Sequence, residues 1–134
     1  MERTLVVLKP DSVERKLIGE IITRFEKKNL TIRDIRMVTV SREKAEEHYA
    51  HVREMPFFHD MVEYITSGPV VSIILEGEKV IQAVRNIIGL TSSFDSPPGT
   101  VRGDFGSHRF KNLIHASDSV ENAEIEIKRF FEDI

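Results

Sequence analysis

His115 is the residue whose setting in this sequence most suggests chemistry. It stands where a short apolar pair, Leu113 and Ile114, meets the polar run ASDS, after which a helical pattern begins. A neutral imidazole is nucleophilic near pH 7 and can also act as an acid or a base. Histidine is common in ordinary turns too, so a structural role stays open from this position alone. Surface or structural roles are expected for the other four histidines: His48, His51, His59 and His108.

Three basic residues could make His115 part of an anion site. Lys9 ends the first apolar run, Arg85 lies near the end of a helical pattern, and Arg102 precedes Asn112 in a long loop. Arginine offers paired donors to phosphate oxygens, and lysine offers a compact charge. Each also has a plain explanation, as an edge charge or as a cation near a helix C-terminus. If the first and last strands are neighbours, these side chains can converge beside His115.

Several common site motifs are missing from the sequence. It contains neither GxxxxGK[ST] nor GxGxxG, so a nucleotide would have to bind without a glycine cradle. The acidic residues Asp95, Asp104 and Asp118 lack the spacing of a metal site, and no metal site made of protein ligands is predicted. The absence of cysteine excludes disulfides, thiolate zinc sites and a cysteine nucleophile.

The elements that must position these residues follow from the apolar pattern. Strands are predicted over residues 4–8, 31–40, 70–77 and 113–115, and helices over 17–28, 42–52, 57–66, 80–88 and 119–131. A break in alternation near Asp34 predicts a bulge. Ser41 is a predicted helix N-cap and Asn29 a predicted helix end, while Asp118 with Glu121 predicts a capping box for the last helix. The apolar face of that helix is predicted to contain Val120, Ala123, Ile127 and Phe130.

This order of elements predicts an α+β fold. Its core matches the ferredoxin-like βαββαβ motif, an antiparallel four-stranded sheet with helices on one face. Residues 89–111 are rich in Gly, Ser and Pro and have no sustained period. Unstructured loops beyond about 12–15 residues are uncommon in compact domains and are usually functional. Phe94, Val101 and Phe105 predict that this loop packs against the domain.

Length and composition restrict the class of protein. A chain of 134 residues, 40% hydrophobic and with a net charge of −3, predicts one domain over residues 1–134. The mild acidity argues against dedicated nucleic-acid binding. No apolar run is long enough for a membrane span, and the N-terminus does not match a signal peptide. A cytoplasmic protein without membrane partners is therefore expected.

Five stretches of the sequence resemble the nucleoside diphosphate kinase family. They are TLVVLKPD, GEIITRFEKKNL, HYAHVREMPFFHDMVEYITSGPVV, PGTVRGDFG and NLIHASDSVENAEIEI, in the family's order and over nearly the whole chain. The resemblance implies transfer of the γ-phosphoryl group from a nucleoside triphosphate to a nucleoside diphosphate. The reaction would be ping-pong, through a phosphohistidine, with broad base tolerance. The resemblance also implies Mg²⁺ bound mainly through nucleotide phosphates, and a homo-oligomer, with a hexamer favoured and a tetramer possible.

The same resemblance assigns roles to individual residues. His115 matches the nucleophile, Ser117 and Glu126 match the pair that orients its ring, and Tyr49 matches a tyrosine beside it. The nucleotide-binding positions are the phosphate ligands Lys9, Arg85, Thr91 and Arg102, the ribose ligands Lys9 and Asn112, and the base-stacking residue Phe57. The long loop would then form one wall of the nucleotide cleft.

Three positions depart from the family pattern. Ala116 stands where the family generally has glycine, and if that backbone needs a positive φ, alanine costs about 1 kcal/mol. Ser93 stands where a loop proline is common in the family. Without the proline ring the loop backbone is less restrained, and the resemblance does not determine the subunit contacts. Arg109 stands where a small aliphatic residue usually flanks the base, and its guanidinium is expected to cover the base or reach a phosphate. Ala116 and Arg109 keep an alternative open, a ferredoxin-like module that binds nucleotides without turning them over.

Overall fold

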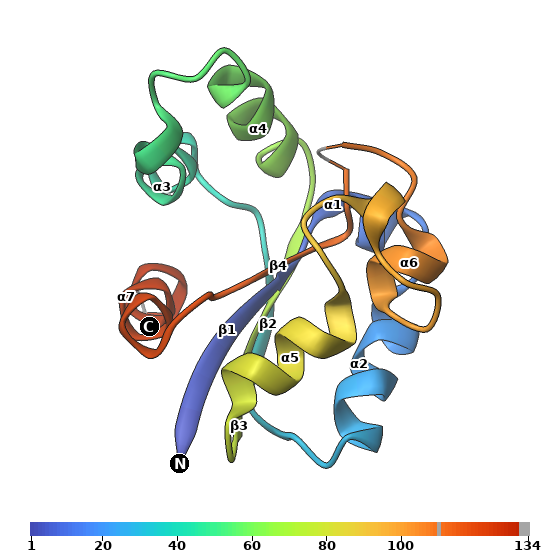
Figure 1. The fold of residues 1–134 in the computed structure, drawn as a ribbon. Helices are drawn as coiled ribbons and strands as arrows, with labels where there is room; N and C mark the ends of the chain where they lie inside the picture. Colours follow the sequence, from blue (N-terminus) through green and yellow to red (C-terminus); the bar gives the residue numbers. More distant parts are fainter. Residues whose placement is uncertain (110, 132–134) are drawn as a thin grey trace.

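The computed structural model describes residues 1–109 and 111–131, which contain one antiparallel four-stranded sheet. Its strands are β1 (Glu2–Leu8), β2 (Thr31–Val38), β3 (Val70–Gly77) and β4 (Ile114–Ala116). The strand order is β2-β3-β1-β4, so β1 lies between the third and the last strand. The sheet order and the helical connections confirm the predicted ferredoxin-like α+β fold (Figure 1).

Helices cover both faces of the sheet, so the expectation of helices on one face is wrong. One face carries α2 (Ile18–Lys27) and α5 (Val80–Ile88), and the other carries α3 (Arg42–His48), α4 (Phe58–Ile65) and α7 (Val120–Phe131) (Figure 1). In β1, Val6 and Leu8 join the first core cluster, while Leu5 and Val7 join the second. A strand that is buried on both faces needs an unbroken apolar run instead of alternation. The run LVVL carries that signal.

Most of the predicted local features, such as the helix cap, the helix end and the bulge, are present in the structure. The Ser41 hydroxyl accepts a hydrogen bond from the backbone N–H of Lys44 at 3.1 Å and caps α3. Asn29, just beyond α2, has a left-handed φ of +64°. The register of β2 against β3 shifts between Ile32 and Asp34, which is the predicted bulge. The helix predicted over residues 42–52 is shorter in the structure. It ends at His48, and a 3-10 turn, η1 (Ala50–Val52), follows it.

The start of α7 differs from the prediction. Ser119 Oγ accepts from the backbone N–H of Asn122 at 3.1 Å, whereas Asp118 accepts from the Asn122 side chain at 2.6 Å. Ser119 is therefore the backbone cap, and no capping box of Asp118 with Glu121 is needed. Val120 is 51% exposed, although Ala123, Ile127 and Phe130 are buried as predicted. Periodicity tells which side of a helix a residue faces, but it does not tell where along the axis the covering sheet ends.

The long loop contains two short helices, η2 (Ser93–Asp95) and α6 (Val101–Phe105). Thr100 Oγ1 caps α6 by accepting from the backbone N–H of Gly103 at 2.9 Å. Val101 is buried in the first core cluster and Phe105 packs against it, but Phe94 is 75% exposed, contrary to expectation. The turn after β1 is a further short helix, α1 (Pro10–Glu14), with proline at its favoured first position. In the described part of the chain, every helix is too short or too polar to cross a membrane.

Gly103 is where α6 packs most closely against the preceding loop. A Cβ at this position would overlap the carbonyl oxygen of Pro97. We therefore expect Gly103→Ala to lower the free energy of unfolding in urea by about 1–3 kcal/mol, because backbone must shift. Gly19, also helical, has nothing within 4 Å of such a Cβ. The matched variant Gly19→Ala should stabilise the protein by about 0.5–1 kcal/mol, and equal effects of the two substitutions would contradict this packing argument.

Candidate active site

The residues that the sequence singled out line a single cleft of about 840 Å³. Its lining contains nine of the ten predicted site residues: Lys9, Tyr49, Phe57, Arg85, Thr91, Arg102, Asn112, His115 and Glu126. Ser117, the tenth, lies behind the cleft wall and contacts Glu126. The expected convergence of Lys9, Arg85 and Arg102 beside His115 is confirmed, because β4 pairs with β1 and places His115 opposite Val7.

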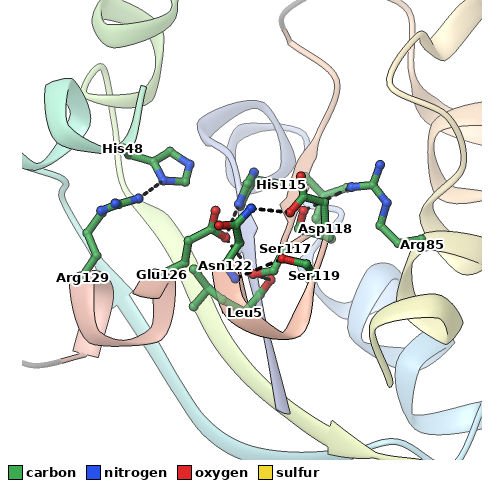
Figure 2. A network of polar contacts seen from close by, with 12 residues as sticks. Leu5, His48, Arg85, His115, Ser117, Asp118, Ser119, Asn122, Glu126 and Arg129 are labelled. Carbon is green, nitrogen blue, oxygen red and sulfur yellow. Dashed lines mark hydrogen bonds and ion pairs between the residues drawn. The ribbon is translucent and has the colours of Figure 1, made fainter. Parts of the chain in front are cut away.

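The His115 ring is held by Glu126 through one nitrogen only. His115 Nε2 and Glu126 Oε1 lie 2.7 Å apart, and Ser117 Oγ donates to the same carboxylate oxygen at 2.7 Å (Figure 2). An ionised carboxylate only accepts hydrogen bonds, so the proton of a neutral His115 sits on Nε2. The lone pair of His115 is consequently on Nδ1, the nitrogen that Glu126 leaves unbound.

Glu126 remains ionised in spite of its partial burial. Burial by itself raises the pKa of this carboxyl, but the hydrogen bonds from His115 and Ser117 and the Arg129 charge outweigh it. The net pKa of Glu126 lies below its usual value. The carboxylate therefore keeps its orienting hydrogen bonds to His115 and Ser117 well into the acid range.

Two of the cations, Lys9 and Arg102, are buried in the cleft wall. Lys9 is 8% exposed, and its Nζ donates to Asn112 Oδ1 at 2.8 Å. Burial, helped by the nearby Arg102 charge, lowers the pKa of Lys9 to about 8. Burial and then Arg85 lower the pKa of Arg102 to about 10. Since desolvation and mutual repulsion disfavour these charges, an anion in the cleft would relieve both costs.

Arg102 also holds the cleft wall together. Its guanidinium donates to the carbonyl oxygens of Leu90 at 3.0 Å, Asn112 at 3.3 Å and Ile114 at 2.6 Å. The Asn112 side chain adds a bond from Nδ2 to the carbonyl oxygen of Thr91 at 3.1 Å. These contacts fasten the loop to the start of β4, so the loop forms a wall of the cleft as predicted.

The backbone strain at this site lies at Leu113, two residues before His115. Leu113 has a φ of +78°, whereas Ala116 lies in β4 opposite Val6 without a positive φ. The destabilisation expected for alanine at position 116 required a positive φ there, so it does not arise. Leu113 is held by its neighbours: its N–H donates to Asp11 Oδ2 at 3.1 Å, and its carbonyl accepts from Lys9 N at 2.8 Å and Ser12 Oγ at 2.5 Å. These side-chain and backbone hydrogen bonds thus hold Leu113 in its strained backbone conformation beside the site.

The remaining predicted residues surround the cleft. Arg85, in the last turn of α5, donates to the carbonyl oxygen of Ala116 at 3.2 Å. Phe57 lies just before α4 and is half-buried. Tyr49 is buried, and burial together with the Glu126 charge raises the pKa of its hydroxyl, which therefore stays protonated at neutral pH. Arg109 also lines the cleft.

The sequence predicted a surface or structural role for His48 but not its contact with His115. His48 is 4% exposed, and its ring stands edge-on to His115 with centroids 4.5 Å apart. The spacing of Ala45 and His48, three residues apart on the buried side of α3, was the available signal. The other three histidines, His51, His59 and His108, are exposed, in agreement with the prediction.

Carboxylates are scarce in the cleft. Among the described lining residues, Glu126 is bonded to His115 and Ser117, and Glu47 is paired with Arg129 at 3.2 Å. Asp118 is the third, and it is exposed. Mg²⁺ prefers six oxygen ligands in octahedral geometry and usually keeps waters and substrate phosphates among them. This donor set therefore fits a divalent ion that arrives on a ligand's phosphates better than one held by the protein alone.

The comparisons with known proteins agree over the whole chain. The family model described as nucleoside diphosphate kinase matches residues 2–134. The nucleoside diphosphate kinase of Acetivibrio thermocellus is 66% identical over 134 residues, which cover 100% of this chain and 98% of the relative. The enzyme of that name from Archaeoglobus fulgidus is 52% identical over 133 residues, which cover 99% and 88%.

Solved structures agree in fold as well as in sequence. A halophilic nucleoside diphosphate kinase from Halobacterium salinarum in complex with CDP has a TM-score of 0.96 at 45% identity and covers 98% of this chain and 88% of its own. An apo nucleoside diphosphate kinase from Encephalitozoon cuniculi gives the same TM-score and identity, with 98% and 89% covered. The chain therefore belongs to the nucleoside diphosphate kinase family and transfers a phosphoryl group between nucleotides through a phosphohistidine.

Proposed function

We propose that His115 is the nucleophile of this reaction and that Nδ1 is its reacting atom. The Nδ1 lone pair attacks the γ-phosphorus of a nucleoside triphosphate, and the bond from that phosphorus to the β,γ-bridging oxygen breaks. The diphosphate leaves, and a terminal oxygen of a second nucleoside diphosphate then attacks the phosphohistidine and restores the imidazole. The observation that carries this proposal is the Glu126 hydrogen bond to Nε2, which leaves Nδ1 as the nucleophilic nitrogen.

We propose that the cations and polar groups of the cleft bind the rest of the nucleotide. The phosphate ligands are Lys9, Arg85, Thr91 and Arg102, the ribose ligands are Lys9 and Asn112, and the base stacks on Phe57. Phosphoryl transfer depends mainly on in-line positioning and charge neutralisation, which these groups provide. Broad base tolerance follows, because a stacking face does not distinguish the hydrogen-bonding edges of the bases.

We propose that Mg²⁺ is the metal and that it binds mainly through the nucleotide phosphates, with Asp118 as the cleft-lining carboxylate that neither holds His115 nor pairs with Arg129. When bound, the ion neutralises charge on the phosphates. We also propose a homo-oligomer, a hexamer in preference to a tetramer. The edge strand β2 supports self-association, since it exposes Ile35 at 45% and Met37 at 57%. A cytoplasmic location fits an enzyme that acts on free nucleotides.

Replacing His115 tests the proposal most directly. We expect His115→Ala to fold normally and to lose several orders of magnitude of phosphate exchange, because the attacking atom is gone. Wild-type protein incubated with ATP and Mg²⁺ should gain one acid-labile phosphate by intact mass, and peptide mapping should locate it at His115. A variant that keeps most of the exchange activity would assign the nucleophile to another residue.

The depressed pKa of Lys9 predicts a pH dependence. Because the charged form is lost as pH rises through about 8, ADP affinity of the free enzyme should fall above that pH and be level below it. Calorimetric titration with ADP between pH 6.5 and 9.5 measures this. Lys9→Arg keeps a positive charge over the whole range, so its affinity should be flat with pH. A wild-type affinity that is equally flat would remove Lys9 from the phosphate site.

We expect the Arg109 side chain to contribute to nucleotide affinity, which a small aliphatic side chain would not do. Its guanidinium is expected to cover the second face of the base or to reach a phosphate. Arg109→Val should therefore raise the dissociation constants of ADP, GDP and CDP, and unequally if the contact is with the base. Unchanged affinities and unchanged base preference would refute this role.

A further inference from the structure

His48 is a buried titratable residue that has no role in the proposed mechanism. It ends α3, and its ring makes edge contacts with His115, Tyr49 and Phe130 at centroid distances of 4.5, 4.9 and 5.3 Å. The plane of His48 is rotated 86° from the plane of His115. The His48 ring thus packs edge-on against the proposed nucleophile.

Arg129 determines which nitrogen of His48 carries the proton. Arg129 Nη1 lies 3.0 Å from His48 Nδ1, and Figure 2 shows the His48 ring between Arg129 and His115. A guanidinium can only donate, so Nδ1 of His48 accepts and the proton of the neutral ring is on Nε2. Arg129 is anchored in turn, because its Nε donates to Glu47 Oε1 at 3.2 Å.

The surroundings of His48 keep it uncharged. Burial is the main cause that lowers its pKa well below the ordinary value, and nearby positive or titratable groups add to it. The charged and titratable groups around this ring come from several elements: Lys9 after β1, Tyr49 after α3, His51 of η1, His115 of β4, and Glu126 and Arg129 of α7. A neutral His48 cannot compete as a cation for Glu126.

The geometry would allow His48 to compete with His115 for the Glu126 carboxylate. Ring nitrogens of His48 and His115 and a carboxylate oxygen of Glu126 all lie within 4.8 Å of one another. If the His48 ring were charged or free to turn, one of its N–H groups could donate to Glu126. The Arg129 hydrogen bond to Nδ1 disfavours protonation of that nitrogen and holds the ring in its present orientation.

A single hydrogen bond does not fix the tilt of the His115 ring. The terminal torsion of histidine is broad, so a ring held only at Nε2 can rock about its Glu126 contact. In-line attack by Nδ1 needs a defined ring direction, and small misplacements cost large factors in rate.

We propose that His48 and Arg129 together form a positioning unit for His115: the Arg129 hydrogen bond to Nδ1 holds the His48 ring in one tautomer and one orientation, and the His48 ring blocks rotation of the nucleophile. This inference rests on the proposed role of His115 and adds to it two residues of the same cleft that act by positioning the His115 ring.

Single-turnover phosphorylation by ATP and Mg²⁺, compared with ADP binding, tests the His48 part. We expect His48→Ala to slow phosphorylation about ten- to a hundredfold, with the ADP dissociation constant changed by less than about twofold. His48→Phe restores a flat ring of similar shape and should recover most of the rate. If His48→Ala is phosphorylated at the wild-type rate, or if the phenylalanine variant is no better than the alanine variant, the positioning role is wrong.

Arg129→Met tests the second part and keeps the buried rings in place, so it remains decisive if His48→Ala does not fold. Loss of the donor and of its charge should raise the pKa of His48, and the acid limb of kcat/KM should move to higher pH. Nitrogen-15 spectra should show the His48 proton no longer confined to Nε2. Lys128→Met removes one charge from an exposed neighbour on the same helix and should change neither. Equal pH profiles of Arg129→Met and Lys128→Met would overturn the role of Arg129.

Failure of this inference can be told apart from failure of the proposed function. If the wild-type phosphate maps to a residue other than His115, the proposed nucleophile is wrong. If it maps to His115 and the His48 and Arg129 variants are labelled as fast as wild type, only the positioning unit is wrong.

Discussion

The hydrogen bond from His115 Nε2 to Glu126 determines which nitrogen of the imidazole can do chemistry, and the rest of the site is arranged around that choice. The two residues come from different elements, β4 and α7, so the bond forms only when the last helix folds back over the sheet. Ser117, immediately beyond β4, adds a second donor to the same oxygen. Because the carboxylate is held from two directions and stays ionised, it can orient the ring without taking part in covalent chemistry.

Charge burial is the second constraint. Lys9 and Arg102 are nearly inaccessible, and burial is the main cause that lowers the pKa of both; the Arg102 charge adds to it at Lys9, and the Arg85 charge adds to it at Arg102. Some of their N–H groups donate to carbonyl and amide oxygens, which holds both cations in fixed positions in the cleft wall. Preorganised donors of this kind need little rearrangement when negative charge develops on a transferring phosphoryl group. The same bonds fasten the loop to the strand that carries His115, so the rigidity of the wall and the field of the site have a common origin.

Much of the fold and of the site could be predicted from the sequence. Strand and helix signals are local, and the Ser41 cap, the left-handed Asn29 and the bulge near Asp34 lie where short-range chemistry requires them. The family resemblance added residue roles, and nine of those ten residues line one cleft. The departure at Ala116 does not weaken the case for an enzyme, because that position lies in an ordinary strand. Exposure was harder to predict: Val120 and Phe94 face solvent, because solvent exposure depends on what covers a residue.

The sequence by itself determined the apolar runs, the turn residues and the presence of an isolated histidine followed by a capped helix. The tertiary structure decided which side chains meet. It put helices on both faces of the sheet, moved the backbone strain from the expected Ala116 to Leu113, and brought His48 of α3 and Arg129 of α7 together beside His115. The physical reason is the range of the forces. Patterning and capping act over a few neighbouring residues, whereas tautomers, shifted pKa values and ring contacts depend on groups that are distant in the chain and become neighbours only on folding.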